Sequence, residues 1–484
     1  MSTYAFVILL LGIAILIIQN LYFFYGYFGY DDMHYAKLSY TFLNGTLDFS
    51  NHYSYRWTIL FLTTLSYHIF GISDFSVALP SLALSCGILG LMYLTFRHNP
   101  FILAMSILLY FSVRWNIFYA DKLMPDIYVS FFLFTAWLSY DKMIRKAGHY
   151  YLNSTVFVLS LFFAFLSKGT VILIVPLLNV YFLWNVKEGN LTKWKYPLLL
   201  GSFVLALYFI LIYVMTGHPF SRFHAIEDNS YFNACSYNQM PISVIVNRIT
   251  VGFVQLAWNE SLLKFLVIAI AAKIYVYYNV SSIKLKKRIS FYCTTILILF
   301  FSMNFMTISL SSYNPACLDI RHYLFSIPIM SVCVGYILQD LSLTKRIKMV
   351  IIIVAFISVI PTLMHMRYAK SLHFNETKED IVNIVAELQN ENAILISNQV
   401  MLNLINFYSK YEFDGKLFSA KEFTQEQCED NCYIVSNWYT EFHSSTDLDN
   451  IKDALEKDEI ELEFIPQSTD GYDGMVIHKI VIKK

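Results

Sequence analysis

Two adjacent carboxylates, Asp31 and Asp32, are the first residues along the chain that are suited to chemistry. They follow directly on the first long apolar run. Neighbouring carboxylates at a membrane surface are costly to desolvate and repel each other. A solvated helix N-cap is the alternative, because Asp suits a helix start. In a chain this poor in acidic residues we favour a functional pair.

Further candidates lie at the ends of later apolar runs. Asp126 follows Pro125 and opens such a run, although Pro-Asp is also a good helix start. Lys168 ends another run, where a lysine that extends its ammonium group to the membrane surface is an equally good interpretation. Arg321 precedes a late run and has Asp319 as an alternative partner. These positions place charged residues at the ends of apolar runs.

The elements that must position these residues are membrane-spanning helices. The chain has 484 residues, of which 57% are hydrophobic and 14% are charged, whereas a soluble domain carries roughly a quarter charged residues. Its apolar runs of about 20 residues match the thickness of a bilayer, in which only helices satisfy an isolated backbone segment. We predict eleven spans, at 5–26, 77–96, 100–118, 127–141, 151–166, 170–185, 197–216, 260–279, 290–310, 322–340 and 349–366. The shorter apolar stretch 57–70 is predicted to lie on the membrane surface.

The distribution of basic residues gives the orientation. With a cytoplasmic N-terminus, the inner loops carry 14 Lys and Arg in 42 residues and the outer loops carry 8 in 120. Ten of the thirteen acidic residues in 1–366 then lie on the outer face. The sequence therefore predicts an integral membrane protein, with an acidic site and the C-terminal domain both outside the cytoplasm.

Residues 367–484 have a different composition from the membrane module, 1–366. They hold 22 of the 35 acidic and 11 of the 35 basic residues, a net charge of −11. A helical pattern at 377–390 and β-rich runs at 393–397, 432–436, 461–465 and 475–482 predict a soluble α/β domain. The tail shows no nucleotide-binding or hydrolase motif, so we expect a packing or partner-binding domain. Cys428 and Cys432 form either a disulfide or a free pair.

Other partners and cofactors are constrained only loosely. A net charge of zero argues against a nucleic-acid partner. Four outer-loop histidines near acidic residues make a divalent cation conceivable, but no ligand spacing specifies one. These histidines are His34, His52, His218 and His224.

Several short motifs follow one another at characteristic spacings. They are Asp31-Asp32, Phe70-Gly71-Ile72-Ser73-Asp74-Phe75 ahead of Leu79-Pro80-Ser81, Pro125-Asp126, Leu166-Ser167-Lys168-Gly169, Thr216-Gly217-His218-Pro219-Phe220 and Arg321-His322-Tyr323. In this order they resemble the GT-C glycosyltransferases of the protein O-mannosyltransferase and lipid A aminoarabinose transferase type, over about residues 1–330. Two positions depart from that pattern: Asp32 stands where Glu is common, and Ala78 where Arg precedes Leu-Pro-Ser.

The resemblance implies a GT-C fold and transfer of a sugar from a polyprenyl-phosphate carrier to an acceptor hydroxyl. Asp31 or Asp32 would take the hydroxyl proton, and Asp126 would orient the acceptor or help to hold a cation. Positive charge for the leaving phosphate would come from side chains near the membrane surface. The substrate-binding residues expected on this basis are Lys168, Arg321, Arg222, Tyr323 and His34.

The acceptor is open between protein, lipid and glycan, and the expected location is a bacterial inner (plasma) membrane. Two other functions compete with transfer. One is a transporter or flippase for lipid-linked sugar, although the charges sit at span ends and no internal repeat is evident. The other is a non-enzymatic envelope assembly protein that works through its acidic tail.

Overall fold

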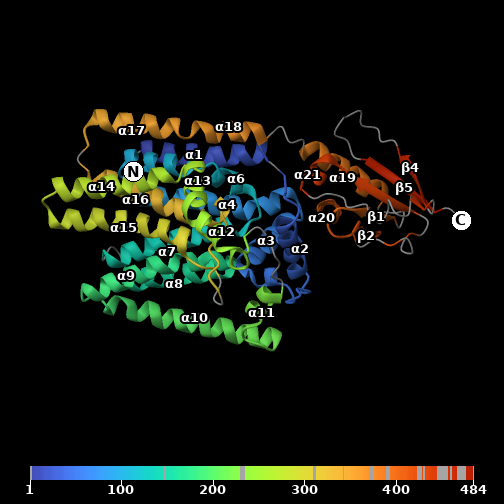
Figure 1. Ribbon diagram of the computed structural model, residues 1–484, viewed down its shortest axis with the longest axis horizontal. Helices are drawn as coiled ribbons and strands as arrows, with labels where there is room; N and C mark the ends of the chain where they lie inside the picture. The colour runs from blue at the N-terminus through green and yellow to red at the C-terminus, as the bar shows by residue number, and fades with distance from the viewer. Residues whose placement is uncertain are drawn as a thin grey trace. The chain divides into compact units, whose positions relative to one another are not determined.

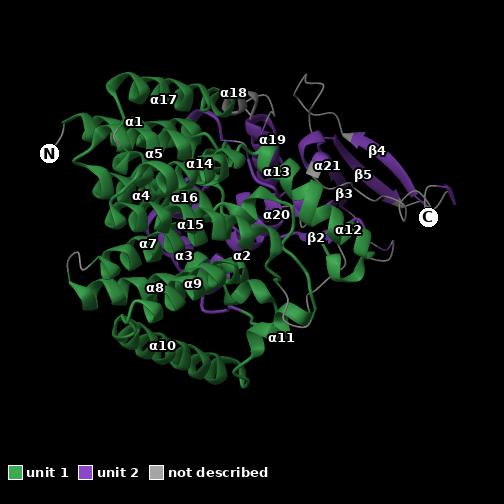
Figure 2. Ribbon diagram, turned by 60° about the vertical axis from the view of Figure 1, so that its left-hand side comes forward, with its two compact units in different colours: residues 1–21, 48–59, 81–366 green, residues 22–47, 60–80, 367–484 purple. Residues whose placement is uncertain are grey.

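The structure is a computed structural model dominated by helices, with one small β-sheet in the C-terminal region (Figure 1). It describes residues 3–24, 26–145, 149–228, 235–308, 312–341, 343–369, 374–388, 393–421, 424, 428, 431–443, 456–457, 460–465 and 476–482. The chain divides into two compact units, coloured separately in Figure 2. Unit 1 comprises residues 1–21, 48–59 and 81–366, and unit 2 comprises residues 22–47, 60–80 and 367–484.

Long apolar helices make this an integral membrane protein. Within the described residues, seven segments are long and apolar enough to cross a bilayer. They are α1 (Thr3–Tyr22), α4 (Asp74–Phe96), α8 (Tyr150–Ser167), Gly169–Lys187 with α9 (Val175–Lys187), α10 (Thr192–Thr216), α15 (Ile283–Phe305), and Lys345–Met364 with α17 (Lys345–Ile357) and part of α18 (Ile360–Ala369). Within the described residues, each of the eleven predicted spans overlaps a helix or helix pair.

Two of those pairs are bent, which raises the possible number of spans to nine. The first joins α5 (Pro100–Phe111) to Trp115–Asp121, which contains α6 (Trp115–Phe118), at 81°. The second joins Ile242–Asn259, with α12 (Ile242–Asn247) and α13 (Phe253–Asn259), to α14 (Leu263–Asn279) at 98°. Helices α7 (Pro125–Ile144) and α16 (Ser326–Asp340) match two further predicted spans. Eleven spans, and the surface position of α3 (Trp57–Phe70), stay predictions.

Close helix packing in unit 1 depends on a small residue. Helix α16 packs against α5 and α15, and α7 packs against α8. At Gly335 of α16, a Cβ atom would lie 2.6 Å from the hydroxyl of Ser106 and 3.0 Å from a methyl group of Ile102, both on α5. Small residues allow membrane helices to approach this closely.

Unit 2 contains a five-stranded mixed sheet in the order β2-β1-β3-β5-β4. The strands are β1 (Ile394–Ser397), β2 (Lys416–Ser419), β3 (Cys432–Ser436), β4 (Ile460–Ile465) and β5 (Val476–Ile482). β1 pairs in parallel with β2 and β3, whereas β5 pairs antiparallel with β3 and β4. The α/β character and four predicted strands are confirmed, and β2 was missed.

Helices complete unit 2 and join its separate segments. The predicted helix 377–390 is α19 (Phe374–Leu388), while α20 (Gln399–Tyr408) and α21 (Trp438–His443) were not predicted. Helix α20 packs on β1 and β2, and also on α2 (Asp31–Leu43) from the first predicted outer loop. The sequence-based boundary at 366/367 stays a prediction.

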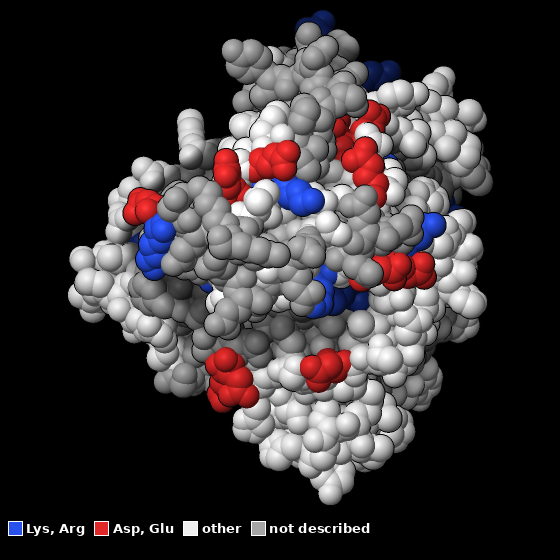
Figure 3. All heavy atoms as spheres, turned by 90° about the vertical axis from the view of Figure 1, so that its right-hand side faces the viewer, with Lys and Arg blue, Asp and Glu red and all other residues white. Residues whose placement is uncertain are grey.

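Acidic and basic side chains are interspersed on the face in Figure 3, so its described surface has no extended basic patch.

We predict that Gly335→Ala destabilises unit 1, because the new methyl group must displace Ser106 and Ile102 in a packed interface. Overpacking of this kind costs about 1–3 kcal/mol. Thermal unfolding of the purified protein in detergent measures the effect. Gly90→Ala on α4 is the matched control, because a Cβ atom there meets nothing within 4 Å. Equal melting temperatures for the two variants would contradict the prediction.

Candidate functional site

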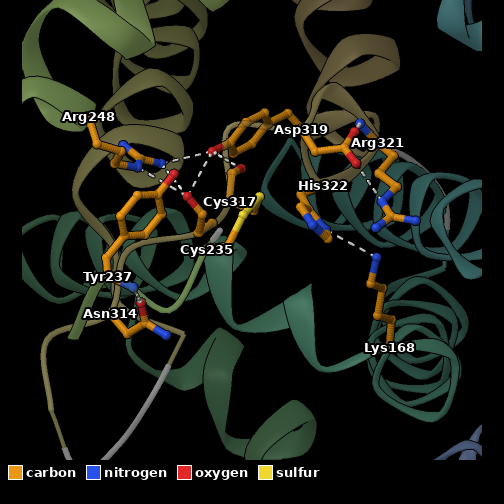
Figure 4. The surroundings of a disulfide bond; sticks show 11 residues. Lys168, Cys235, Tyr237, Arg248, Asn314, Cys317, Asp319, Arg321 and His322 are labelled. Atoms are coloured by element: carbon orange, nitrogen blue, oxygen red, sulfur yellow. Dashed lines mark hydrogen bonds and ion pairs between the residues drawn. A yellow bond between two sulfur atoms is a disulfide. The ribbon is translucent and has the colours of Figure 1, made fainter. Parts of the chain in front are cut away.

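Lys168 stands at the centre of a polar cluster in unit 1. It follows the last residue of α8, and its ammonium group lies 2.8 Å from Oδ1 of Asp126 and 3.1 Å from Nδ1 of His322. Figure 4 shows the Lys168 side chain directed at the His322 ring. The contact between Lys168 and Asp126 places the end of α8 against the start of α7, where Pro125 and Asp126 lie in the first turn. Lys168 is thus held by two side chains from distant parts of the sequence.

Asp126 is buried, with a side-chain exposure of 2%. One carboxylate oxygen binds Lys168, while the buried Oδ2 has no hydrogen-bond partner within the described part of the chain. A buried polar atom without a partner is costly, and at a candidate site it marks a place where a ligand group or water completes the bonding. Asp126 thus forms an ion pair in addition to its place in the first turn of α7, and its role toward a substrate stays a prediction.

Positive charge accumulates around this lysine. Burial lowers the pKa of Lys168; the Asp126 carboxylate opposes that shift, and the guanidinium groups of Arg321 and Arg56 add to it. Burial likewise lowers the pKa of His322 well below its ordinary value, and the same three cations reinforce the effect. His322 is therefore neutral near pH 7, and its Nδ1 accepts a hydrogen bond from the lysine.

The flanking arginines are positioned by local packing. Arg321 pairs with Asp319 at 2.7 Å, and the Asp319 side chain also accepts from the backbone N–H of Arg321. Arg56 lies between Tyr55 and Trp57, which pack in an apolar cluster with α8 and α10. The hydroxyl of Thr58 donates to the carbonyl of Phe163 on α8. The start of α3 is thereby tied to the helix that ends at Lys168.

Arg248 holds the loop that carries Arg321 and His322 in place through hydrogen bonds. This fully buried guanidinium donates to the carbonyl of Ala316 at 2.6 Å, to Asn304 and Met303 of α15, and to the hydroxyl of Tyr323 at 2.9 Å. A disulfide between Cys235 and Cys317 joins the same loop to the chain before α12 (Figure 4). Sequence reasoning did not pair these cysteines, although both lie in predicted outer loops.

Asp32 lies at the start of α2 in unit 2 and is fully buried. Its carboxylate accepts hydrogen bonds from the backbone N–H groups of Phe28 (2.6 Å), Gly29 (2.9 Å) and Met33 (2.9 Å). Burial raises the pKa of Asp32 to about 6 in spite of these bonds, and the charge of Asp31 adds to the rise. Its neighbour Asp31 is only half-buried. The two adjacent acids thus occupy different environments.

The remaining predicted residues fall in several places. Arg222 on α11 (Ser221–Asp228) is buried over the Phe165 ring and donates to the Phe165 carbonyl at 2.8 Å, so it braces the end of α8. The Tyr323 hydroxyl is engaged by Arg248 and by the Cys317 carbonyl. His34 is half-buried on α2. Substrate contacts of all three stay predictions.

The structure brings Asp126, Lys168 and Arg321 together and adds His322 and Arg56, which sequence reasoning had not selected as site residues. The sequence did offer a signal for Arg56: the predicted outer loops hold only eight basic residues, so a basic residue there is uncommon. Asp31 and Asp32 belong to unit 2, so their convergence with Asp126 over one cavity stays a prediction. Among the described residues, no group of three His, Cys, Asp or Glu side chains is arranged to hold a metal, and the divalent cation also stays a prediction.

The fold is shared with a solved membrane protein. The chain aligns with ArnT, the lipid A aminoarabinose transferase, from Cupriavidus metallidurans in its complex with undecaprenyl phosphate, with a TM-score of 0.62 and 12% identity over 99% of this chain and 98% of that one. The apo form of the same protein gives a TM-score of 0.60 and 11% identity over the same shares. No family model and no curated protein sequence matches this chain. The predicted GT-C-like fold is confirmed.

We predict that Arg248→Lys lowers the melting temperature of the protein. Lysine has fewer donors than arginine and lacks the planar fork, so it leaves buried carbonyl groups of the 304–323 region without partners. Each buried group left without a partner costs about 1–3 kcal/mol. Thermal unfolding in detergent measures the change, and Arg346→Lys at an exposed position is the control. An unchanged melting temperature for Arg248→Lys would show that this guanidinium is dispensable.

Proposed function

We propose that this protein is a membrane glycosyltransferase that takes a sugar from a polyprenyl-phosphate carrier at the outer membrane face. The observation that carries the proposal is the cationic site at Lys168, whose ammonium group is held by Asp126 and His322. Three cations, Lys168, Arg321 and Arg56, influence one another there. The fold supports this function, because a protein of the same fold has been solved with undecaprenyl phosphate.

The cluster presents three cationic side chains to an anionic ligand. Asp126 pairs with Lys168 and Asp319 pairs with Arg321, and the histidine in contact with Lys168 is neutral. Buried positive charge is stabilised by an anion that supplies further hydrogen-bond acceptors. A lipid phosphate at the membrane surface offers both the charge and the acceptor oxygens. In transfer it leaves as an anion, which is where preorganised positive charge lowers the barrier.

The two acids of the first outer loop take different roles in this proposal. Asp32 already accepts three backbone N–H bonds, so both of its oxygens are committed to the start of α2. Asp31 is half-buried on the first turn of the same helix. We assign Asp31 as the general base and Asp32 as the residue that holds the helix start in place.

The reaction then balances without a further co-reactant. The acceptor hydroxyl attacks the anomeric carbon, its proton passes to the Asp31 carboxylate, and a new C–O bond forms. The bond between the anomeric carbon and the phosphate oxygen breaks, and its electron pair stays on the phosphate. Lys168, Arg321 and Arg56 stabilise that charge, while Asp126 holds Lys168 and offers its second oxygen to the acceptor. The acceptor is a protein, lipid or glycan hydroxyl.

We predict that Asp31→Asn lowers transfer by roughly a hundredfold or more, since general bases contribute about 10²–10⁴-fold. Membranes that contain the variant are incubated with a panel of labelled undecaprenyl-phosphate monosaccharides, including aminoarabinose and hexoses. Label that leaves the carrier for a product is measured. Asp48→Asn, at an outer-loop acid that accepts hydrogen bonds from Ser50 in its own turn, should keep full activity. Undiminished transfer by Asp31→Asn would overturn the base assignment, and carrier movement without product would point to a transporter.

We predict that Lys168→Met weakens binding of undecaprenyl phosphate by roughly ten- to a hundredfold, because a hydrogen bond to a charged group is worth about 1.5–3 kcal/mol. Binding to the purified protein is followed by isothermal titration in detergent. Lys37→Met on the exposed face of α2 keeps the carrier affinity of the unaltered protein. If both variants bind equally well, the phosphate site lies elsewhere.

A further inference from the structure

We infer that the C-terminal domain sets the position of Asp31 through Tyr439 and Asn403, which act as positioning residues. The inference rests on the proposed role of Asp31 as the base. It assigns a task to the α/β domain of residues 374–482, which carries no catalytic motif of its own. All the contacts that support it lie within unit 2.

The C-terminal domain donates hydrogen bonds to backbone carbonyl groups of the segment that leads into Asp31. The buried hydroxyl of Tyr439, on α21, donates to the carbonyl of Tyr27 at 2.8 Å. The side-chain amide of Asn403, on α20, donates to the carbonyl of Gly29 at 2.6 Å. Two consecutive helices of the domain thus hold carbonyls that lie two and four residues before the proposed base.

Asp32 binds the backbone N–H groups of the same segment. Its carboxylate accepts from the N–H groups of Phe28 and Gly29. The backbone from residue 27 to residue 29 is therefore tied from both sides, by the C-terminal domain and by the start of α2. Because Asp31 follows two residues later on the first helical turn, the direction of its side chain depends on this backbone.

Two glycines allow the close approach. Gly26 and Gly29 have φ angles of +81° and +80°, a region that residues with a side chain rarely adopt. A Cβ atom at Gly26 would collide with Phe374 and Tyr439, and one at Gly29 would collide with Val400. The C-terminal domain packs against these backbone positions with no room for a side chain.

A second set of bonds connects the same domain to Asp74. One oxygen of Asp74 accepts from the hydroxyls of Tyr27 (2.7 Å) and Tyr408 (3.0 Å), and the other pairs with Lys378 at 2.6 Å. The Tyr27 ring also packs edge-on against Phe374 and Phe407. Burial, reinforced by the Asp74 charge, raises the pKa of Tyr27 well above its ordinary value, so this hydroxyl remains a donor. Tyr27 is therefore held at both its backbone and its side chain.

The test uses Tyr439→Phe, Asn403→Ala and their combination in the full-length protein. Each removes a donor to the segment before Asp31 and leaves the charges of the site unchanged. With the donor identified by the labelled panel, we expect the double variant to lose roughly ten- to a hundredfold in kcat, since small misplacements of catalytic groups cost up to about a hundredfold. The KM for the donor should stay within about twofold, because the phosphate site is unaltered.

Hydrogen–deuterium exchange supplies a readout of position. Exchange of the amides in 26–33 should rise in both single variants, while that of the β1 and β3 amides stays slow. Trp438→Phe is the control, because this neighbour of Tyr439 is 45% exposed. It should change neither kcat nor exchange. Should Asn403→Ala not accumulate, Tyr439→Phe alone carries the test.

The outcomes separate this inference from the proposed function. If Asp31→Asn is inactive but the double variant keeps the kcat of the unaltered protein, the positioning role is wrong and the base assignment stands. A fall in melting temperature with unchanged kcat means that the bonds serve only stability, which also overturns the inference. If Asp31→Asn keeps full transfer activity, the base assignment and this inference fail, whereas the transferase function stands; carrier movement without product is the result that would overturn that function.

Discussion

Burial of the Lys168 ammonium group is the constraint on which the candidate site depends. Removing a charge from water carries a large penalty unless close partners replace the lost hydration. Asp126 and a neutral His322 supply that replacement, and each must come from a different helix start or loop. The start of α7, the end of α8 and the 312–323 loop thus meet around one cation. The guanidinium groups of Arg321 and Arg56 add further positive charge around Lys168.

The hydrogen bonds of Arg248 show how a membrane protein can hold the cluster around Lys168 in place without a β-sheet to support it. Its guanidinium group donates hydrogen bonds to uncharged oxygen atoms of α15 and of the loop before Arg321. The Cys235–Cys317 disulfide links the same loop covalently. Arginine suits this position because its planar group offers five donors in a fixed geometry. The positions of Arg321 and His322 therefore depend on residues that need not touch a substrate.

Two identical side chains at Asp31 and Asp32 acquire different properties from their surroundings. Asp32 is buried and saturated with backbone N–H bonds, whereas Asp31 remains half-exposed one residue earlier. In the proposed reaction, one acid shapes the backbone and the other accepts a proton. The α/β domain contributes in the same way, since Tyr439 and Asn403 bind carbonyls of the segment that leads to both acids.

The sequence alone determined the features that follow from local periodicity and composition. Apolar runs of membrane length identified the helices, and alternating β-rich runs identified four of the five strands, because both patterns reflect burial along one short segment. The order of the acidic and basic motifs predicted the fold and placed Asp126, Lys168 and Arg321 among the candidates. Only the tertiary structure decided their partners. The pairing of Lys168 with His322, the disulfide of Cys235 with Cys317, and the attachment of residues 22–47 and 60–80 to the C-terminal domain join positions that are far apart in the chain. Local patterns carry no information about such contacts, since they arise from the packing of whole helices and loops.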